Sequence, residues 1–290
     1  MTDAGSSVPR RQLGRYLRQA REQAGLSLEA SAKELEVSRA TMYRIEGGQT
    51  AVRKADVVAM CTTYGTPPEM ASVLIALAAE TKAKGWWHAY GDAIPAWFEL
   101  YVGLEAAASR LRHWEPASLP GLLQTKEYAE SLLCSNPDTP GQEVDRLVTV
   151  RMERQQILAR RSPAPPKLEV ILDEIVLRRK DPAMPQQLVH LSEQIARGAA
   201  VIRVVPTRTA GINYALTGGG FVILDFPAIG IRTPEPTTVY SESLTGALYL
   251  DKPTEVAAYA RAWRALEAIS LDPIRSADLI AMIAKESSDE

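Results

Sequence analysis

The sequence predicts an α+β chain: an all-α amino-terminal domain of five helices followed by a mixed α/β domain with a largely antiparallel sheet. Three observations support this. Apolar residues recur at helical spacing as far as about residue 82. Beyond the proline-rich run at 162–166, short apolar runs typical of strands alternate with helical segments. The length of 290 residues accommodates about two domains, which we place at 1–83 and 84–290.

The five helices of the first domain are marked by their apolar spacing and by the residues at their ends. They are expected at about residues 13–24, 28–35, 39–46, 53–64 and 68–82. Ser27 and Ser38 are suitable N-caps for the second and third helices. Gly25 ends the first helix, and Gly47-Gly48 ends the third.

The second domain mixes both kinds of element. Helices are expected at about 95–112, 126–134, 142–161, 185–197, 254–269 and 276–285, and strands at 168–172, 201–205, 221–226, 238–240 and 247–250. The last strands follow one another too closely for helical crossovers, which favours antiparallel pairing. Asp173-Glu174 is interpreted as a helix cap with a first-turn charge. Gly218–Gly220 is interpreted as a hairpin turn or bulge, since no phosphate-loop lysine follows it.

Charge is distributed unevenly along the chain. The formal net charge is −2, but residues 10–54 carry ten basic and five acidic side chains, a net +5, whereas 55–290 carry −6. A basic head on an acidic body favours a polyanionic partner for the head. An ordinary solvated helix face is the alternative on charge alone.

The second and third helices, separated only by residues 36–38, have the spacing of a unit that docks in the major groove of DNA. Met42 and Ile45 face inward on the third helix, which turns its polar residues outward. Arg39 and Arg44 can donate to guanine edges or phosphates, and Ala40 can touch a thymine methyl group. The predicted contacts to double-stranded operator DNA are Ser27, Lys33, Ser38, Arg39, Ala40, Thr41, Tyr43, Arg44 and Arg53, and the arginines of the first helix are expected at phosphates.

The stretch from Leu26 to Ala32 and from Ser38 to Gly48 resembles the Xre-type helix-turn-helix of phage repressors and Cro proteins. That resemblance implies a lambda-repressor-like domain of five helices. Two positions depart from the family: Glu36 stands where glycine is usual in the turn, and Leu28 where glutamine often begins the second helix. A positive φ at Glu36 would cost of order 1 kcal/mol. A plain helical domain with exposed arginines is the alternative.

Aromatic residues crowd the beginning of the second domain. Trp86, Trp87, Trp97, Tyr101 and Trp114 are candidates for a ligand pocket or a partner surface, with plain core packing as the alternative. His113 and Glu115 could form a base with its orienting carboxylate, but neighbouring strand residues point to opposite faces. We find no Gly-x-Ser-x-Gly elbow and predict no catalytic residues, so an enzyme is not expected.

Several further sequence motifs resemble those of antitoxin-like regulators of actinomycetes, which join an Xre-type head to a large carboxy-terminal domain. These motifs are His113-Trp114-Glu115-Pro116, Leu119–Thr125 with Tyr128-Ala129, Arg151 with Arg154-Gln155, Leu172–Glu174, Gly220-Phe221 and Val239-Tyr240. The resemblance implies a DNA-binding regulator, often encoded beside a small partner protein. Where such relatives often show Gly-Ala-His, this chain has Gly211-Ile212-Asn213, so any ligand role of that histidine is absent.

We therefore predict a cytoplasmic transcription factor that acts as a homodimer on a two-fold operator. Its second domain would bind a small partner protein or a small-molecule effector. Two cysteines and three scattered histidines give no metal-site spacing, and no cofactor or membrane span is expected. The alternatives are a one-component sensor with an aromatic pocket and an enzyme domain fused to a DNA-binding head.

Overall fold

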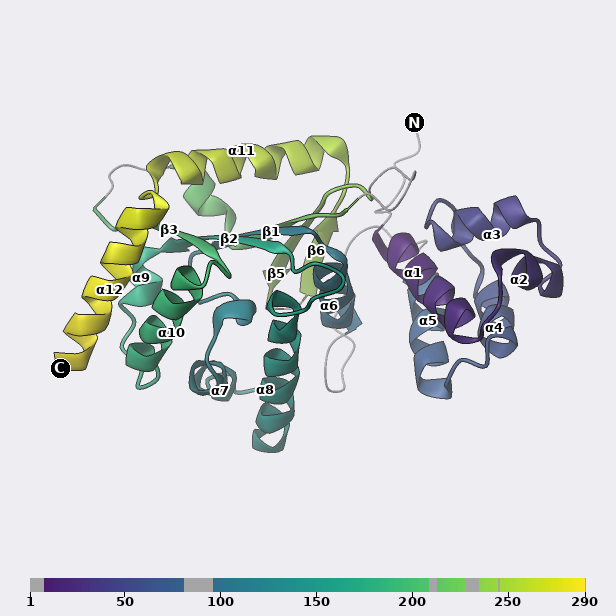
Figure 1. The fold of residues 1–290 in the computed structure, drawn as a ribbon, viewed down its shortest axis with the longest axis horizontal. Helices are drawn as coiled ribbons and strands as arrows, with labels where there is room; N and C mark the ends of the chain where they lie inside the picture. Colours follow the sequence, from purple (N-terminus) through teal and green to yellow (C-terminus); the bar gives the residue numbers. More distant parts are fainter. Residues whose placement is uncertain (1–7, 81–95, 209–212, 228–234, 245, 290) are drawn as a thin grey trace. The chain divides into compact units, whose positions relative to one another are not determined.

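The computed structural model describes residues 8–80, 96–208, 213–227, 235–244 and 246–289 (Figure 1). The chain forms two compact units: the helical head groups with residues 96–104, 243–244 and 246–252, and the other described residues form the second unit. The predicted boundary between residues 83 and 84 lies outside the described residues. No helix in the described ranges is long and apolar enough to cross a bilayer.

The head consists of the five predicted helices. They are α1 (Val8–Gln23), α2 (Leu28–Glu34), α3 (Arg39–Glu46), α4 (Lys54–Thr63) and α5 (Pro68–Glu80). Both predicted serine caps are confirmed: the Ser27 hydroxyl accepts from the Ala30 amide and the Ser38 hydroxyl from the Thr41 amide, each at 3.0 Å. The left-handed conformation of Gly25 (φ 71°) follows the end of α1, as predicted.

The core of the head gathers around the inner side of α3. Met42 and Ile45 are buried against apolar residues of the other four helices, among them Leu17, Ala32 and Leu74. This burial is the main source of stability for helices as short as α2 and α3, which would not persist alone in water. The apolar periodicity of the sequence therefore predicted the core correctly.

Two buried polar contacts complete the head. The Arg21 guanidinium of α1 forms a bidentate pair with the Glu46 carboxylate of α3, with Nε–Oε1 at 2.6 Å and Nη2–Oε2 at 3.0 Å. The hydroxyl groups of Ser31 and Tyr64 lie 2.6 Å apart and join α2 to the end of α4. The first contact fixes α3 against α1 and the second fixes α2 against the end of α4, orientations that sequence periodicity alone does not set.

The α/β region contains a six-stranded sheet in the order β3-β2-β1-β4-β5-β6. Its strands are β1 (Arg110–Glu115), β2 (Lys167–Asp173), β3 (Val201–Val205), β4 (Phe221–Asp225), β5 (Thr238–Ser243) and β6 (Gly246–Leu250). Its helices are α6 (Ala96–Ala107), α7 (Lys126–Cys134), α8 (Gly141–Gln155), α9 (Glu174–Leu177), α10 (Met184–Ala196), α11 (Pro253–Ile269) and α12 (Pro273–Asp289), with 3-10 turns η1 (Gly121–Leu123), η2 (Gln156–Leu158) and η3 (Tyr214–Gly218). Figure 1 shows α10 on one face of the sheet and α11 on the other.

The direction of each strand follows the length of its connection. β1 pairs with β4 and β4 with β5 in antiparallel register, whereas β1–β2 and β2–β3, whose connections contain helices, are parallel. The predicted α+β class with a largely antiparallel sheet is confirmed. The cap at Asp173 is confirmed too, since its carboxylate accepts from the Ile175 amide.

One predicted element was wrong. The helix expected over 95–112 ends at Ala107, and residues from Arg110 onward form β1, which lies between β2 and β4 in the sheet. Helix-forming residues continue up to Ala108 and masked the change of period. Leu111 and Trp114 are buried, because the sheet is covered on both faces and its inner strand lacks a simple polar–apolar alternation.

The edge of the sheet at β3 is covered by the chain itself. The Val204 amide donates to the Ser276 hydroxyl at 3.0 Å, and the Leu271 amide donates to the Val204 carbonyl at 2.8 Å. Ser276 is completely buried in the first turn of α12. Both backbone groups of Val204 that a further strand would use are therefore occupied.

Candidate nucleic-acid interface

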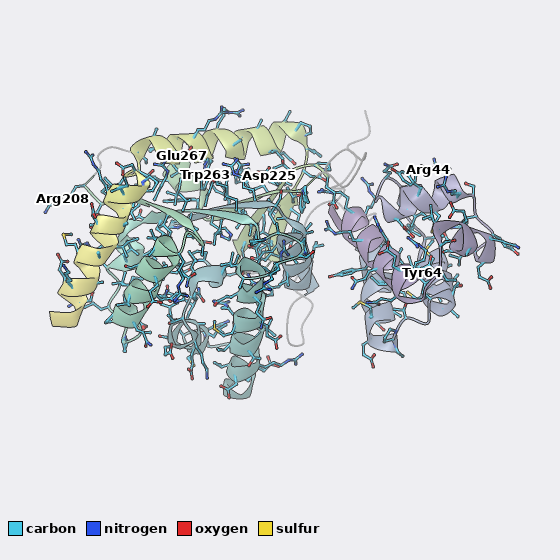
Figure 2. All side chains as sticks on the ribbon, viewed as in Figure 1. Arg44, Tyr64, Arg208, Asp225, Trp263 and Glu267 are labelled. Atoms are coloured by element: carbon cyan, nitrogen blue, oxygen red, sulfur yellow. The ribbon has the colours of Figure 1, made fainter. Side chains whose placement is uncertain are left out.

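The outer side of α3 presents a short row of polar and small side chains. Arg39, Ala40, Tyr43 and Arg44 are exposed, at the i, i+1, i+4, i+5 spacing of one helix face. The opposite face carries the buried residues Met42, Ile45 and Glu46. Figure 2 shows Arg44 on the outer side of α3, whereas Tyr64 lies within the head. A helix with this division can enter a major groove without disturbing its own core.

All nine residues predicted to contact DNA lie at or near the surface of the head. Eight are exposed and Thr41 is half-buried; the set is Ser27, Lys33, Ser38, Arg39, Ala40, Thr41, Tyr43, Arg44 and Arg53. Ser38 and Thr41 are linked through their hydroxyl groups at 2.9 Å, and Arg44 Nη2 lies 3.5 Å from Thr41 Oγ1. The start of α3 and the middle of its outer face thus form one connected polar surface.

Two of these arginines are held by acidic neighbours. Arg39 forms an exposed ion pair with Glu29 at the start of α2. The backbone amide of Glu29 and then the guanidinium of Arg39 lower the pKa of the Glu29 carboxyl. Arg53 binds Asp56 through two hydrogen bonds of 3.0 and 3.2 Å. Exposed pairs of this kind are weak, so a phosphate or a base can replace the carboxylate.

The expectation that the arginines of the first helix contact phosphates was wrong for Arg21. Its guanidinium is buried against Glu46, and the hydrogen bond that it donates to that carboxylate raises the pKa of Arg21. The sequence held a signal for this pair, since Glu46 lies four residues after Met42 and so on the same inward face. A carboxylate among inward-facing residues requires a cationic partner.

The turn between α2 and α3 contains the unusual backbone conformation that the sequence pointed to. Glu36 has φ 53°, and it is the only non-glycine residue with positive φ in the described ranges. The left-handed region costs a side-chain-bearing residue of order 1 kcal/mol. The turn therefore adopts a left-handed conformation without a glycine.

The aromatic residues proposed as a ligand or partner surface fall into two groups. Tyr101 is 4% exposed and Trp114 is fully buried, so packing accounts for both. Phe98 lies beside Tyr101, with ring centroids 6.2 Å apart. Trp86 and Trp87 lie outside the described residues, as does the side chain of Trp97.

Comparison with known families also divides the chain into the helical head and the α/β region. The family described as "Helix-turn-helix domain" matches residues 12–74, a range that includes all nine predicted contacts. The head is thus a helix-turn-helix domain. The family described as "Domain of unknown function (DUF5753)" matches residues 98–282, more than half of the chain. The chain belongs to the DUF5753 family. No curated protein matches it.

Within the DUF5753 region, one pair rejected from the sequence does come together. His113 and Glu115 are two positions apart in β1 and therefore share a face, and His113 Nδ1 lies 3.3 Å from Glu115 Oε1. Because side chains alternate between the two faces of a strand, Trp114 points to the opposite face while His113 and Glu115 point to the same one. His113 is buried, whereas Glu115 is only half-buried.

The DUF5753 region also gathers residues from distant segments at this end of β1. Gln124 follows η1, Arg151 and Arg154 lie on α8, and Tyr240 lies on β5. These residues belong to the motifs that resemble antitoxin-like regulators, and the sequence predicts no individual role for them. Their spacing in the sequence gives no indication of their proximity, which depends on the order of the strands.

Proposed function

We propose that this chain is a sequence-specific transcriptional regulator of the Xre type, in which α3 enters the major groove of operator DNA. The outward row of α3 carries the proposal. Its four exposed side chains stand on a helix whose inner face is fully buried, and the groove, about 12 Å wide, accepts one such helix.

The proposed contacts differ in what they determine. Arg39 and Arg44 donate to guanine edges, and Ala40 meets a thymine methyl group. Lys33 and Arg53 contact phosphates, which set affinity and not sequence. The four backbone N–H groups at the start of α3, of which Ser38 satisfies one, add a favourable environment for a phosphate.

The remaining parts of the proposal concern assembly and regulation. A single α3 supplies few base contacts, so the protein would act in the cytoplasm as a homodimer on two half-sites about one helical turn apart. The DUF5753 region would bind an effector or a small antitoxin-type partner, and we propose for it no catalytic activity of its own. One-component sensing by this region is the second candidate, and the carboxylate and arginine groups described below favour it.

The test is a binding experiment on DNA selected by the purified protein from fragmented genomic DNA. Arg44→Ala should weaken binding to the selected site by about 1–3 kcal/mol and relax its specificity. Lys33→Ala should weaken binding to all sequences about equally and reduce the salt dependence. Fluorescence anisotropy at several salt concentrations measures both.

The matched control is Arg197→Ala, which removes an exposed arginine of the DUF5753 region that pairs only with Glu193 on its own helical stretch. This variant should bind as the unaltered protein does. Equal binding by the Arg44 and Lys33 variants and the control would reject the proposal.

A further inference from the structure

The end of the sheet where β1 and β5 finish carries two carboxylates on one face. His113 lies opposite Val222, and Val222 lies opposite Tyr240, so the three side chains project from the same face of β1, β4 and β5. Two residues further along, Glu115 and Glu242 reach that face as well. Tyr240 donates its hydroxyl to Glu242 Oε2 at 2.8 Å, which orients this carboxylate.

A glycine separates the two carboxylates. Continuing the register of β4 by one residue places Gly220 between Glu115 and Glu242. A Cβ atom at residue 220 would lie 3.3 Å from the Trp114 carbonyl oxygen and 3.8 Å from Glu115 Oε2. Strands two apart in a sheet are separated by about 10 Å. The absent side chain therefore leaves space between two acidic groups.

Arg151 of α8 lies close enough to Glu242 for each charge to influence the pKa of the other. Arg151 Nη1 donates to Gln124 Oε1 at 2.7 Å, and Gln124 is itself fixed by donating to the Leu119 carbonyl at 2.6 Å. This is the only side-chain hydrogen bond of Arg151 to any residue of the described ranges, so its other N–H groups are available. The neighbouring Arg154, in contrast, is matched by Glu105 through two hydrogen bonds of 3.0 Å.

The charges in this group influence one another without pairing. Burial and, to a lesser extent, the positive charge of Arg154 lower the pKa of Arg151 to about 10. Burial raises the pKa of Glu242, and the charge of Glu115 adds to this effect, although Glu242 keeps access to solvent. In the part of the chain that the structure describes, no ion pair joins Arg151 to either carboxylate.

One further polar atom in the group lacks a partner. His113 is 3% exposed, and its Nε2 atom makes no hydrogen bond within the described residues. In the described residues, His113 Nε2 is buried without a hydrogen-bond partner and Arg151 is half-buried without an ion pair, and both conditions cost folding free energy. Such an arrangement is typical of a binding site, where a ligand supplies the missing partners.

We propose that this carboxylate–arginine cluster (His113, Glu115, Gln124, Arg151, Tyr240 and Glu242) binds a small zwitterionic metabolite of the amino-acid type. Its carboxylate pairs with the free N–H groups of Arg151, and its ammonium group lies between Glu115 and Glu242 in the space left by Gly220. Occupancy changes the affinity of the head for DNA, a part that rests on the proposed function.

The probes are the twenty proteinogenic L-amino acids, titrated singly into the full-length protein by calorimetry, with acetate and methylammonium as probes that carry one charge each. At least one amino acid should bind with a Kd of about 1 mM or lower. Acetate and methylammonium should bind at least tenfold more weakly. Equal binding by either of them, or no binding by any amino acid, overturns the proposal.

Variants locate the site. Arg151→Gln and Glu242→Gln should each weaken binding at least tenfold, whereas Arg146→Gln, an exposed position on the same helix α8, should leave the Kd unchanged. Should Arg151→Gln fail to fold, the exposed position Glu242 decides. Unchanged binding in Glu242→Gln places the ligand elsewhere and rejects the cluster. Because the calorimetry contains no DNA, its outcome is independent of the Arg44 experiment.

Discussion

The helical head and the DUF5753 region both contain a buried bidentate arginine–glutamate pair, and the pairs have different neighbours. In the head, Arg21 and Glu46 join α1 to α3, and the other buried arginine of α1, Arg11, has a carboxylate of its own in Asp251 at 3.4 Å. In the DUF5753 region, Arg154 and Glu105 join α8 to α6 in the same geometry, but a second arginine, Arg151, lies beside them without a carboxylate of its own.

This difference indicates what kind of partner each region can bind. The head pairs its buried arginines with carboxylates and exposes Arg39, Arg44 and Arg53, so its partner meets an exposed surface. The DUF5753 region keeps the half-buried Arg151 without a carboxylate partner in the described residues, which favours a small molecule as the binding partner. The burial of a charged residue alone therefore does not indicate a function. A buried charge indicates a binding site when it lacks a partner of opposite charge.

Removing the carboxylate from either buried pair should change stability more than any other substitution considered. Glu46→Gln removes the bidentate partner of the buried Arg21 and leaves only the exposed Glu22, 3.7 Å away, so it should lower the free energy of unfolding of the head by about 3–5 kcal/mol. Glu105→Gln should do the same to the DUF5753 region. Residues 8–80 contain no tryptophan. Urea unfolding followed by tryptophan fluorescence should therefore move with Glu105→Gln, and helical circular dichroism alone with Glu46→Gln.

The control for this experiment is the double variant Arg21→Met with Glu46→Leu, which replaces the pair by apolar groups and should recover most of the loss. A tryptophan transition that shifts equally in both glutamine variants would contradict the separate roles of the two pairs.

The sequence predicted the head better than the DUF5753 region, for physical reasons. Caps, glycines and apolar spacing are local signals, and α3 was placed at Arg39–Glu46 with its outward residues. The carboxylate–arginine cluster is assembled from β1, η1, α8 and β5, so its members become neighbours only through the strand order. β1 itself was missed because helix-forming residues precede it directly.

A second comparison concerns the backbone. Among the described residues of the DUF5753 region only glycines, such as Gly198 and Gly219, have positive φ, whereas the head places Glu36 in the left-handed region in addition to its glycines. Glu36→Gly should raise the free energy of unfolding by up to about 1 kcal/mol, because glycine adopts this φ without strain. Urea unfolding by circular dichroism measures it, and Glu36→Ala, which removes the charge but keeps the strain, should show no such gain. A glycine variant less stable than the alanine variant would contradict the assignment of strain.

The smallest change is expected in DNA affinity when the exposed ion pair of Glu29 with Arg39 is removed. Glu29→Gln releases Arg39 and removes a negative charge near the DNA, so affinity should rise about two- to fivefold at low salt. Glu34→Gln makes the same charge change on α2 at an exposed residue without an ion pair to Arg39. Fluorescence anisotropy should show the larger gain for Glu29→Gln, and equal gains would assign the effect to net charge alone.

The occupied backbone of Val204 limits how copies of this protein can associate. An approaching strand would find both groups of that residue engaged by Leu271 and Ser276, and it would have to displace the start of α12 to pair along β3. Continuous sheets across two subunits, and uncontrolled growth into fibrils from this side, are thereby disfavoured. A dimer of this protein is accordingly expected to form through helical or side-chain surfaces and not by extension of β3.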